Sequence, residues 1–211
     1  MPPQPPREMP AAVARRIPLD GDLPPARAAE LVSGDQHAVV LTGEWAGASA
    51  IVASEPRELV DSGPADLPLA RTTALTAAPG DVIAGGGWLG FIGSRAAARL
   101  AGPGVTPPPA RERLPALVLG YYDHLLVRDR QGRWWFEMLW TEDRDADLRR
   151  RSEVLAGRLA RLSETPPASL GERLTGEWSA GPSPAAHSLA VDACRERIAC
   201  GDLYQANLSL R

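Results

Sequence analysis

Two side-chain amides lie near the end of the sequence at alternate positions. Gln205 and Asn207 belong to a segment, Leu203 to Arg211, in which Tyr204, Ala206, Leu208 and Leu210 alternate with the polar residues Gln205, Asn207, Ser209 and Arg211. Alternation with a period of two predicts a β-strand that has one packed face and one polar face. Amides held on a strand hydrogen-bond a polar ligand with fixed geometry. The pattern therefore indicates either the wall of a ligand pocket or a sheet edge that faces solvent.

A glycine-rich motif lies in the middle of the chain. Residues 85–90 read Gly-Gly-Gly-Trp-Leu-Gly and match G-x-G-x-x-G, in which glycines allow a backbone to approach a pyrophosphate. Only a short candidate strand, residues 81–84, precedes the motif, and a proline-rich stretch, residues 103–109, replaces the second strand of a βαβ unit. The context favours close packing of a glycine-rich strand or turn over a dinucleotide site.

The cysteines and histidines do not form a recognisable site. Cys194 and Cys200 lie six residues apart on a predicted helix, about 120° apart in projection. His187 lies near the start of that helix, and a zinc ligand set is not expected. His37 and His124 have no acid or nucleophile nearby in the sequence that would suggest a catalytic pair.

Composition excludes several classes of function. The 211 residues carry a net charge of −3, and all 23 basic residues are arginine, so the chain supplies no Schiff-base or P-loop lysine. A mildly acidic chain without a basic block does not fit a nucleic-acid partner. Two cysteines indicate a reducing, cytoplasmic setting, and no apolar run is long enough to span a membrane.

The elements that must position these residues predict an α+β fold, mainly an antiparallel sheet with flanking helices. We expect a flexible tail over residues 1–18, a domain over 19–165, a linker over 166–184 and the start of a second domain over 185–211. Periodicity and turn residues predict a helix over 23–32 capped by Asp22, strands over 38–41 and 50–53, a hairpin over 117–140, an amphipathic helix over 146–162 and a further helix that stops at Gly201. The triplet Arg149, Arg150 and Arg151 is expected on the exposed side of its helix.

The last fifteen residues resemble a known family. Residues 197–211, Arg-Ile-Ala-Cys-Gly-Asp-Leu-Tyr-Gln-Ala-Asn-Leu-Ser-Leu-Arg, are similar to the Ile-x-x-Gly-Asp-Ile-Tyr-Gln-Val-Asn-Leu-Ser-x-Arg motif of the chorismate-utilising enzymes, specifically component I of aminodeoxychorismate synthase. Residues 86–93 and 119–124 also resemble segments of the amino-terminal region of these enzymes, although residues 93–95 depart from its Gly-Tyr-Asp pattern. The resemblance extends from about Val39 to the end of the sequence.

The resemblance implies the amino-terminal part of the anthranilate synthase component I-like fold and an activity. The complete enzyme would convert chorismate and ammonia to 4-amino-4-deoxychorismate, in para-aminobenzoate and folate biosynthesis. Asn207 favours this subtype over anthranilate synthase. Related enzymes that add water carry a lysine where this chain has Gln205, and an amide does not take a proton at neutral pH, so ammonia is implied as the nucleophile.

The resemblance also implies a cofactor, two binding partners and the absence of activity in this chain alone. Mg²⁺ would be the cofactor, with its ligands beyond Arg211 and none in this chain, and this chain alone would be inactive. Ammonia would come from a glutamine amidotransferase, either a subunit or a fused domain. Thr42 and Ser49 are candidates to line a tryptophan pocket. The alternatives are anthranilate synthase component I, for tryptophan biosynthesis, and a non-catalytic module that binds tryptophan or docks a subunit.

Overall fold

The computed structural model describes residues 11–61, 75–77, 82–100, 115–167 and 181–208. The chain divides into two compact units, residues 1–167 and residues 168–211, and each is described by itself. Parts of the predicted tail, linker and last strand, residues 1–10, 168–180 and 209–211, lie outside the described residues, as does the proline-rich stretch 103–109.

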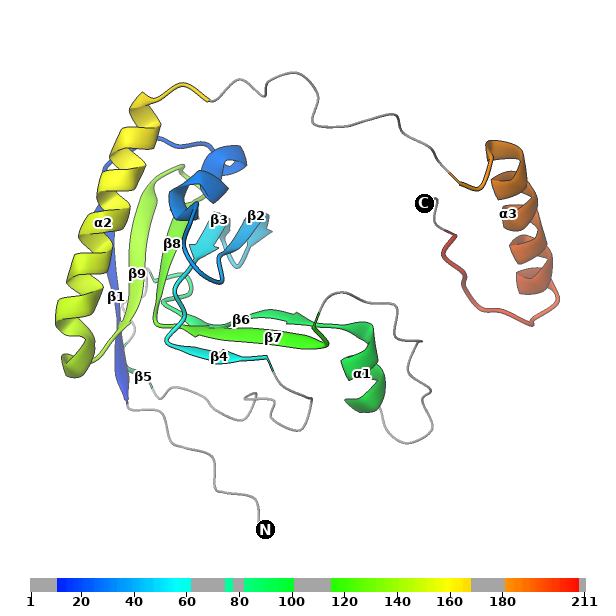
Figure 1. Ribbon diagram of the computed structural model, residues 1–211, viewed down its shortest axis with the longest axis horizontal. Coiled ribbons are helices and arrows are strands. Elements are labelled where there is room, and N and C mark those ends of the chain that lie inside the picture. Colours follow the sequence, from blue (N-terminus) through cyan, green and yellow to red (C-terminus); the bar gives the residue numbers. More distant parts are fainter. Residues whose placement is uncertain (1–10, 62–74, 78–81, 101–114, 168–180, 209–211) are drawn as a thin grey trace, which may run out of the picture. The chain divides into compact units, whose positions relative to one another are not determined.

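The first unit contains two β-sheets (Figure 1). The larger has six strands in the order β2-β3-β8-β9-β1-β5, and the smaller has three in the order β4-β7-β6. Among the described strands only β1 and β5 pair in parallel. The strands are β1 Ala12–Leu19, β2 Val39–Trp45, β3 Ala48–Ala53, β4 Glu58–Val60, β5 Leu75–Ala77, β6 Gly87–Ile92, β7 Leu117–Tyr122, β8 His124–Asp129 and β9 Trp134–Trp140. The predicted α+β fold with mainly antiparallel sheet is confirmed.

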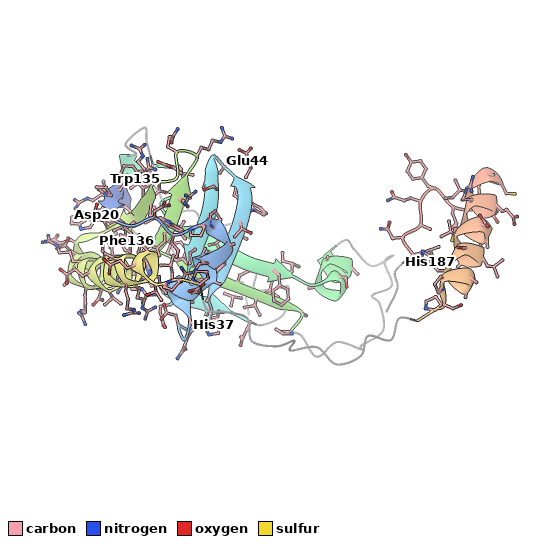
Figure 2. The ribbon with its side chains drawn as sticks, turned by 90° about the horizontal axis from the view of Figure 1, so that it is seen from above. Asp20, His37, Glu44, Trp135, Phe136 and His187 are labelled. Atoms are coloured by element: carbon pink, nitrogen blue, oxygen red, sulfur yellow. The ribbon has the colours of Figure 1, made fainter. Side chains whose placement is uncertain are left out.

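The hairpin of β8 and β9 forms the centre of the larger sheet. Leu126 lies opposite Phe136 in the antiparallel register, and both side chains are fully buried. Neighbouring residues of β9 face opposite sides of the sheet, as Trp135 and Phe136 do (Figure 2). The sheet is consequently packed on both faces, which explains why β9 reads as an almost continuous apolar run.

One face of the larger sheet is covered by helix α2, Asp145–Glu164, and by a 3-10 helix, Pro25–Val32 (Figure 1). Leu148, Leu155 and Leu159 of α2 are buried in the same cluster as Trp134 and Phe136. Burial of each leucine contributes about 1.5–3 kcal/mol. The predicted amphipathic helix over 146–162 is confirmed, and the predicted strands over 38–41 and 50–53 correspond to β2 and β3.

The predicted helix over 23–32 forms, but as a 3-10 helix that Asp22 does not cap. The N-cap residue is Pro24, which has no side chain able to accept a hydrogen bond. The Asp22 carboxylate lies 3.4 Å from the guanidinium of Arg128 instead.

The prediction of a flexible tail over residues 1–18 is wrong for Ala12–Pro18. These residues belong to β1, which pairs antiparallel with β9 from Val13 opposite Trp140 to Leu19 opposite Trp134. The buried face of this strand consists partly of alanines, Ala12 and Ala14, so its apolar alternation is weak in the sequence. The prolines at both ends of the segment and the adjacent Arg15 and Arg16 further weaken the strand pattern in the sequence.

The second unit contains one described helix, α3, Pro184–Ala199. The Ser183 hydroxyl accepts a hydrogen bond from the Ala186 amide at 3.3 Å and caps its start. Cys200 is its C-cap and Gly201 follows with a φ of +81°, which glycine adopts without strain, so the predicted stop at Gly201 is confirmed.

The predicted strand over Leu203–Arg211 is wrong for the residues that the structure describes. Residues 203–208 have no strand conformation, and none of the described strands pairs with them. A β-strand requires a neighbour that takes its backbone hydrogen bonds, and alternation in the sequence does not supply one.

The close approach of the β6 backbone at Gly90 to the β7 backbone yields the first prediction. A Cβ at Gly90 in β6 would lie 2.9 Å from the Leu119 Cα and closer still to the Val118 carbonyl oxygen. Both are backbone atoms of β7 and cannot rotate away, so Gly90→Ala should lower the free energy of unfolding by about 1–3 kcal/mol.

The matched control is Gly157→Ala, in the interior of α2, where a Cβ meets no atom within 4 Å. This change should raise the free energy of unfolding by about 0.5–1 kcal/mol. Urea unfolding of the 211-residue chain, followed by circular dichroism, measures both. Equal stability of Gly90→Ala and the parent chain would contradict the described packing of β6 on β7.

Candidate functional site

The two amides expected in a ligand pocket lie on an exposed segment after α3. Gln205 and Asn207 are both exposed, and the neighbouring Tyr204 side chain is 98% exposed. Within the described part of the second unit, these amides therefore face solvent and not a packed interior. Their role in binding chorismate stays a prediction.

Thr42 and Ser49, the candidates for a tryptophan pocket, have different environments. Thr42 is exposed on β2, and its carbonyl oxygen accepts a hydrogen bond from the Trp45 indole at 3.1 Å. The Ser49 hydroxyl on β3 lies 3.2 Å from the Arg128 carbonyl oxygen and 3.1 Å from that of Asp129. Ser49 thus helps to hold β3 beside β8, while Thr42 is available to a ligand.

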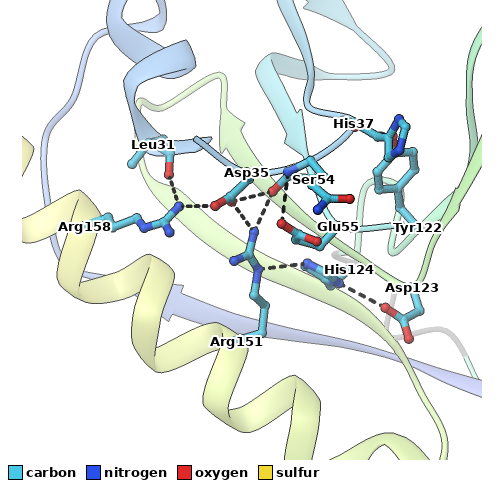
Figure 3. Close-up of polar contacts among 11 residues, drawn as sticks. Leu31, Asp35, His37, Ser54, Glu55, Tyr122, Asp123, His124, Arg151 and Arg158 are labelled. Atoms are coloured by element: carbon cyan, nitrogen blue, oxygen red, sulfur yellow. Dashed lines mark hydrogen bonds and ion pairs between the residues drawn. The ribbon is translucent and has the colours of Figure 1, made fainter. Parts of the chain in front are cut away.

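A cluster of buried and partly buried polar side chains surrounds Asp35, which follows the 3-10 helix (Figure 3). Its carboxylate accepts hydrogen bonds from Arg151 Nη2 at 2.5 Å, from Arg158 Nη1 at 2.9 Å and from the Ser54 hydroxyl at 2.9 Å. Arg158 also donates to the Leu31 carbonyl oxygen at 3.0 Å. The Asp35 side chain is only 7% exposed, so this cluster ties α2 to the 3-10 helix and to the end of β3.

The cluster continues through His124 at the start of β8 (Figure 3). Arg151 Nε donates to His124 Nε2 at 3.3 Å, and His124 Nδ1 lies 3.0 Å from Asp123 Oδ1. Since an arginine has only donors, His124 Nε2 must be the acceptor and Nδ1 must carry the proton. The second Asp123 oxygen accepts from Arg144 Nε at 2.8 Å.

Hydrogen bonds set the pKa of both aspartates. Burial alone would raise the pKa of Asp35, but hydrogen bonds from Arg151, Arg158 and Ser54 outweigh burial and hold it below the ordinary value of 3.8. Burial likewise opposes the hydrogen bonds from His124 and Arg144 to Asp123, and the net result is again a lowered pKa. Both carboxylates are therefore ionised at neutral pH.

This arrangement is structural and not catalytic. Both His124 ring nitrogens are occupied, the ring stacks on Phe136 with 5.6 Å between ring centres, and its residue is 4% exposed. A general base needs a nitrogen within reach of the proton it removes, and His124 has none open. The cluster stabilises the packing of α2.

Two expectations about these residues are wrong. Arg149 and Arg150 are exposed as expected, but Arg151 points inward to Asp35. The signal was present, because Arg151 and Arg158 lie four before and three after the buried Leu155, on one side of the helix. His124 does have a partner, and it is the preceding residue, Asp123.

The glycine-rich motif holds an internal carboxylate. The backbone amides of Ile83, Ala84 and Gly85 donate to the Glu137 carboxylate at 2.8–2.9 Å, and Glu137 is fully buried. A Cβ at Gly86 would lie 2.5 Å from the Tyr122 carbonyl oxygen. The expected close packing is confirmed, and Glu137 occupies the amides that would otherwise receive an external anion.

Two further properties concern only the residues that the structure describes. None of their His, Cys, Asp and Glu side chains gather in groups of three or more suited to a metal ion, and His187, Cys194 and Cys200 are no exception. No helix among them is long and apolar enough to cross a membrane.

The class of protein follows from a comparison with known families, and the antiparallel α+β unit is consistent with it. The family model of the chorismate binding enzymes matches residues 33–211, which include β2 to β9, both long helices and the exposed amides. The chain belongs to the chorismate binding enzyme family. A comparison with curated proteins finds no match.

The cluster around Asp35 yields the second prediction. Asp35→Asn removes the charge that Arg151 and Arg158 share, and both guanidinium groups are partly buried, so the free energy of unfolding should fall by about 3 kcal/mol. Asp147→Asn is the control, because Asp147 pairs with Arg144 and Arg150 at an exposed position and should cost less than about 1 kcal/mol. Urea unfolding at pH 7 compares the two. An equal decrease in the free energy of unfolding for Asp35→Asn and Asp147→Asn would contradict the conclusion that Asp35 stabilises the packing of α2.

The lowered pKa values of Asp35 and Asp123 yield the third prediction. A carboxyl group whose pKa is lower in the folded chain stabilises it above the unfolded pKa, near 3.8, and this contribution disappears as the pH falls through the folded pKa. The parent chain should therefore lose stability progressively below about pH 5. Asp35→Asn should lose less over the same range, and urea unfolding from pH 6 to pH 2.5 measures the slope. Parallel pH profiles would count against the ionised Asp35.

Proposed function

We propose that the chain is part of component I of an aminodeoxychorismate synthase, which replaces the C4 hydroxyl of chorismate by an amino group derived from ammonia. The reaction forms a C4–N bond and breaks the C4–O bond, and the hydroxyl leaves as water with the proton that ammonia loses, which yields 4-amino-4-deoxychorismate. The observation that carries the proposal is the segment Gln205-Ala206-Asn207-Leu208, together with membership of the chorismate binding enzymes.

The side chain of Gln205 supports ammonia as the nucleophile. A lysine at this position could remove a proton from water, whereas a primary amide donates and accepts hydrogen bonds but does not take a proton at neutral pH. Ammonia is already nucleophilic and needs no base to attack. The amide would instead orient the reacting centre, with Asn207 as the second polar contact.

The exposure of residues 205–208 is compatible with a role of their amides in substrate binding. Gln205 and Asn207 have free donors and acceptors, because no described residue hydrogen-bonds their side chains. Chorismate carries two carboxylates and a hydroxyl, each of which pairs with amide groups. In the proposed complex these amides would bind and orient the substrate.

The remaining parts of the proposal follow from the resemblance. Mg²⁺ would bind the substrate carboxylate and neutralise developing charge, but the described residues offer no set of ligands that fits it. A glutamine amidotransferase would supply ammonia, and tryptophan would bind near Thr42 and Ser49. A cytoplasmic setting agrees with the two unpaired thiols, Cys194 and Cys200.

The experiment that tests the proposal is complementation by the gene from which this sequence is translated, in its full reading frame. Growth of a para-aminobenzoate auxotroph without growth of a tryptophan auxotroph is expected. The reverse pattern would assign anthranilate synthase activity instead. Growth of neither, with tryptophan binding detected by calorimetry, would favour the non-catalytic module.

Substitutions in the segment give the fourth prediction. In the protein that complements, Asn207→Val should lower kcat/KM for chorismate about 10- to 100-fold, because one hydrogen bond to a charged group is lost. Cys200→Ser is the control, since Cys200 is exposed just before the segment. Steady-state assay of chorismate consumption with ammonium measures both. Unchanged kinetics for Asn207→Val would remove Asn207 from the proposed site.

A further inference from the structure

A groove of about 520 Å³ lies beside the start of α2, away from the residues assigned so far. Its lining comes from β1, from the end of β9 and from the first turns of α2, and comprises Arg15, Arg16, Ile17, Met138, Trp140, Asp145, Leu148 and Arg149. This volume is in the range of small-molecule sites, about 300–1,000 Å³. We infer that this groove binds an aromatic monocarboxylate.

The groove carries one positive charge in excess. Arg16 is matched by Glu137, 3.4 Å away. The Asp129 carboxylate, 3.9 Å from Arg16, pairs more closely with Arg133 at 3.1 Å. Asp145 pairs with Arg149 at 2.9 Å and accepts the Trp140 indole N–H at 2.7 Å, so both of its oxygens are occupied.

Arg15 supplies the excess charge. Its guanidinium is exposed and stacks 3.7 Å above the centre of the Trp140 ring. The Asp145 carboxylate attracts this guanidinium electrostatically, but Asp145 already pairs with Arg149 at 2.9 Å, so one positive charge is left over. A guanidinium that stacks on one face keeps its edge of N–H donors for a carboxylate and its other face for a second ring.

The rest of the lining suits an aromatic body. Ile17 is 38% exposed, which is high for an isoleucine on a strand, and Met138 and Leu148 lie beneath. Sulfur and aliphatic groups make favourable contacts with aromatic rings. An aromatic ring would therefore cover exposed apolar surface while its carboxylate neutralises Arg15.

The fifth prediction tests this groove with 2-naphthoate. The 211-residue chain should show saturable shifts of the Trp140 indole N–H signal in ¹H–¹⁵N spectra, assigned by Trp140→Phe. The uncharged isostere 2-naphthamide should bind at least about tenfold more weakly, since it lacks the charge that Arg15 recognises. Arg15→Gln should raise the Kd for 2-naphthoate by a similar factor.

The control is Arg150→Gln, at an exposed position of α2 that is not part of the groove lining. It should leave the Kd for 2-naphthoate unchanged. Equal affinity for acid and amide, no effect of Arg15→Gln, or shifts only at other indole signals would each overturn the inference. Cyclohexanecarboxylate binding as tightly as 2-naphthoate would overturn the aromatic specificity. None of these outcomes depends on chorismate turnover, so failure here leaves the proposed function standing.

Discussion

The packing of the first unit depends on the Asp35 carboxylate. It is the single acceptor between two arginines of α2, Arg151 and Arg158, and it binds the Ser54 hydroxyl at the end of β3. Desolvation of three charged groups is costly unless each is paired. The geometry satisfies this condition, and so it fixes the position of α2 along the sheet more sharply than its leucines could, because hydrophobic contacts are not directional.

Fully paired polar groups also limit where chemistry can occur in this unit. Glu137 fills the glycine-rich turn, Asp123 and Arg151 occupy both nitrogens of His124, and Ser49 bonds two carbonyl oxygens. Most of the hydrogen-bonding capacity of these groups is therefore used within the fold. Exposed polar groups are found at other described residues, among them the amides after α3 and Arg15.

Sequence reasoning predicted the elements whose signal is local. The hairpin of β8 and β9 and helix α2 were predicted because aromatic runs around a turn and leucines at helical spacing reflect short-range rules. The predicted hairpin over 117–140 also included β7, which pairs instead with β4 and β6 in the smaller sheet. Strand β1 was missed because it is stabilised by pairing with β9, more than a hundred residues away, and its alanines carry little apolar signal. The segment after α3 was overpredicted for the same reason, since alternation indicates a strand only where a neighbouring strand exists. The Asp35 cluster was missed because it joins residues 35, 54, 124, 151 and 158 across the fold.

The absence of lysine gives these contacts a common chemical basis. Arg15 and Arg16 each stack 3.7 Å above a tryptophan of β9, and Arg158 binds a carboxylate and a backbone carbonyl with one nitrogen. An ammonium group is a point charge without a planar face, so it could not stack flat on an indole ring as these guanidinium groups do. The residue that binds a carboxylate while it covers Trp140 must be an arginine. The stacking of Arg15 from β1 on Trp140 of β9 therefore also holds a guanidinium in place, and this guanidinium is the group that would bind the carboxylate in the proposed groove.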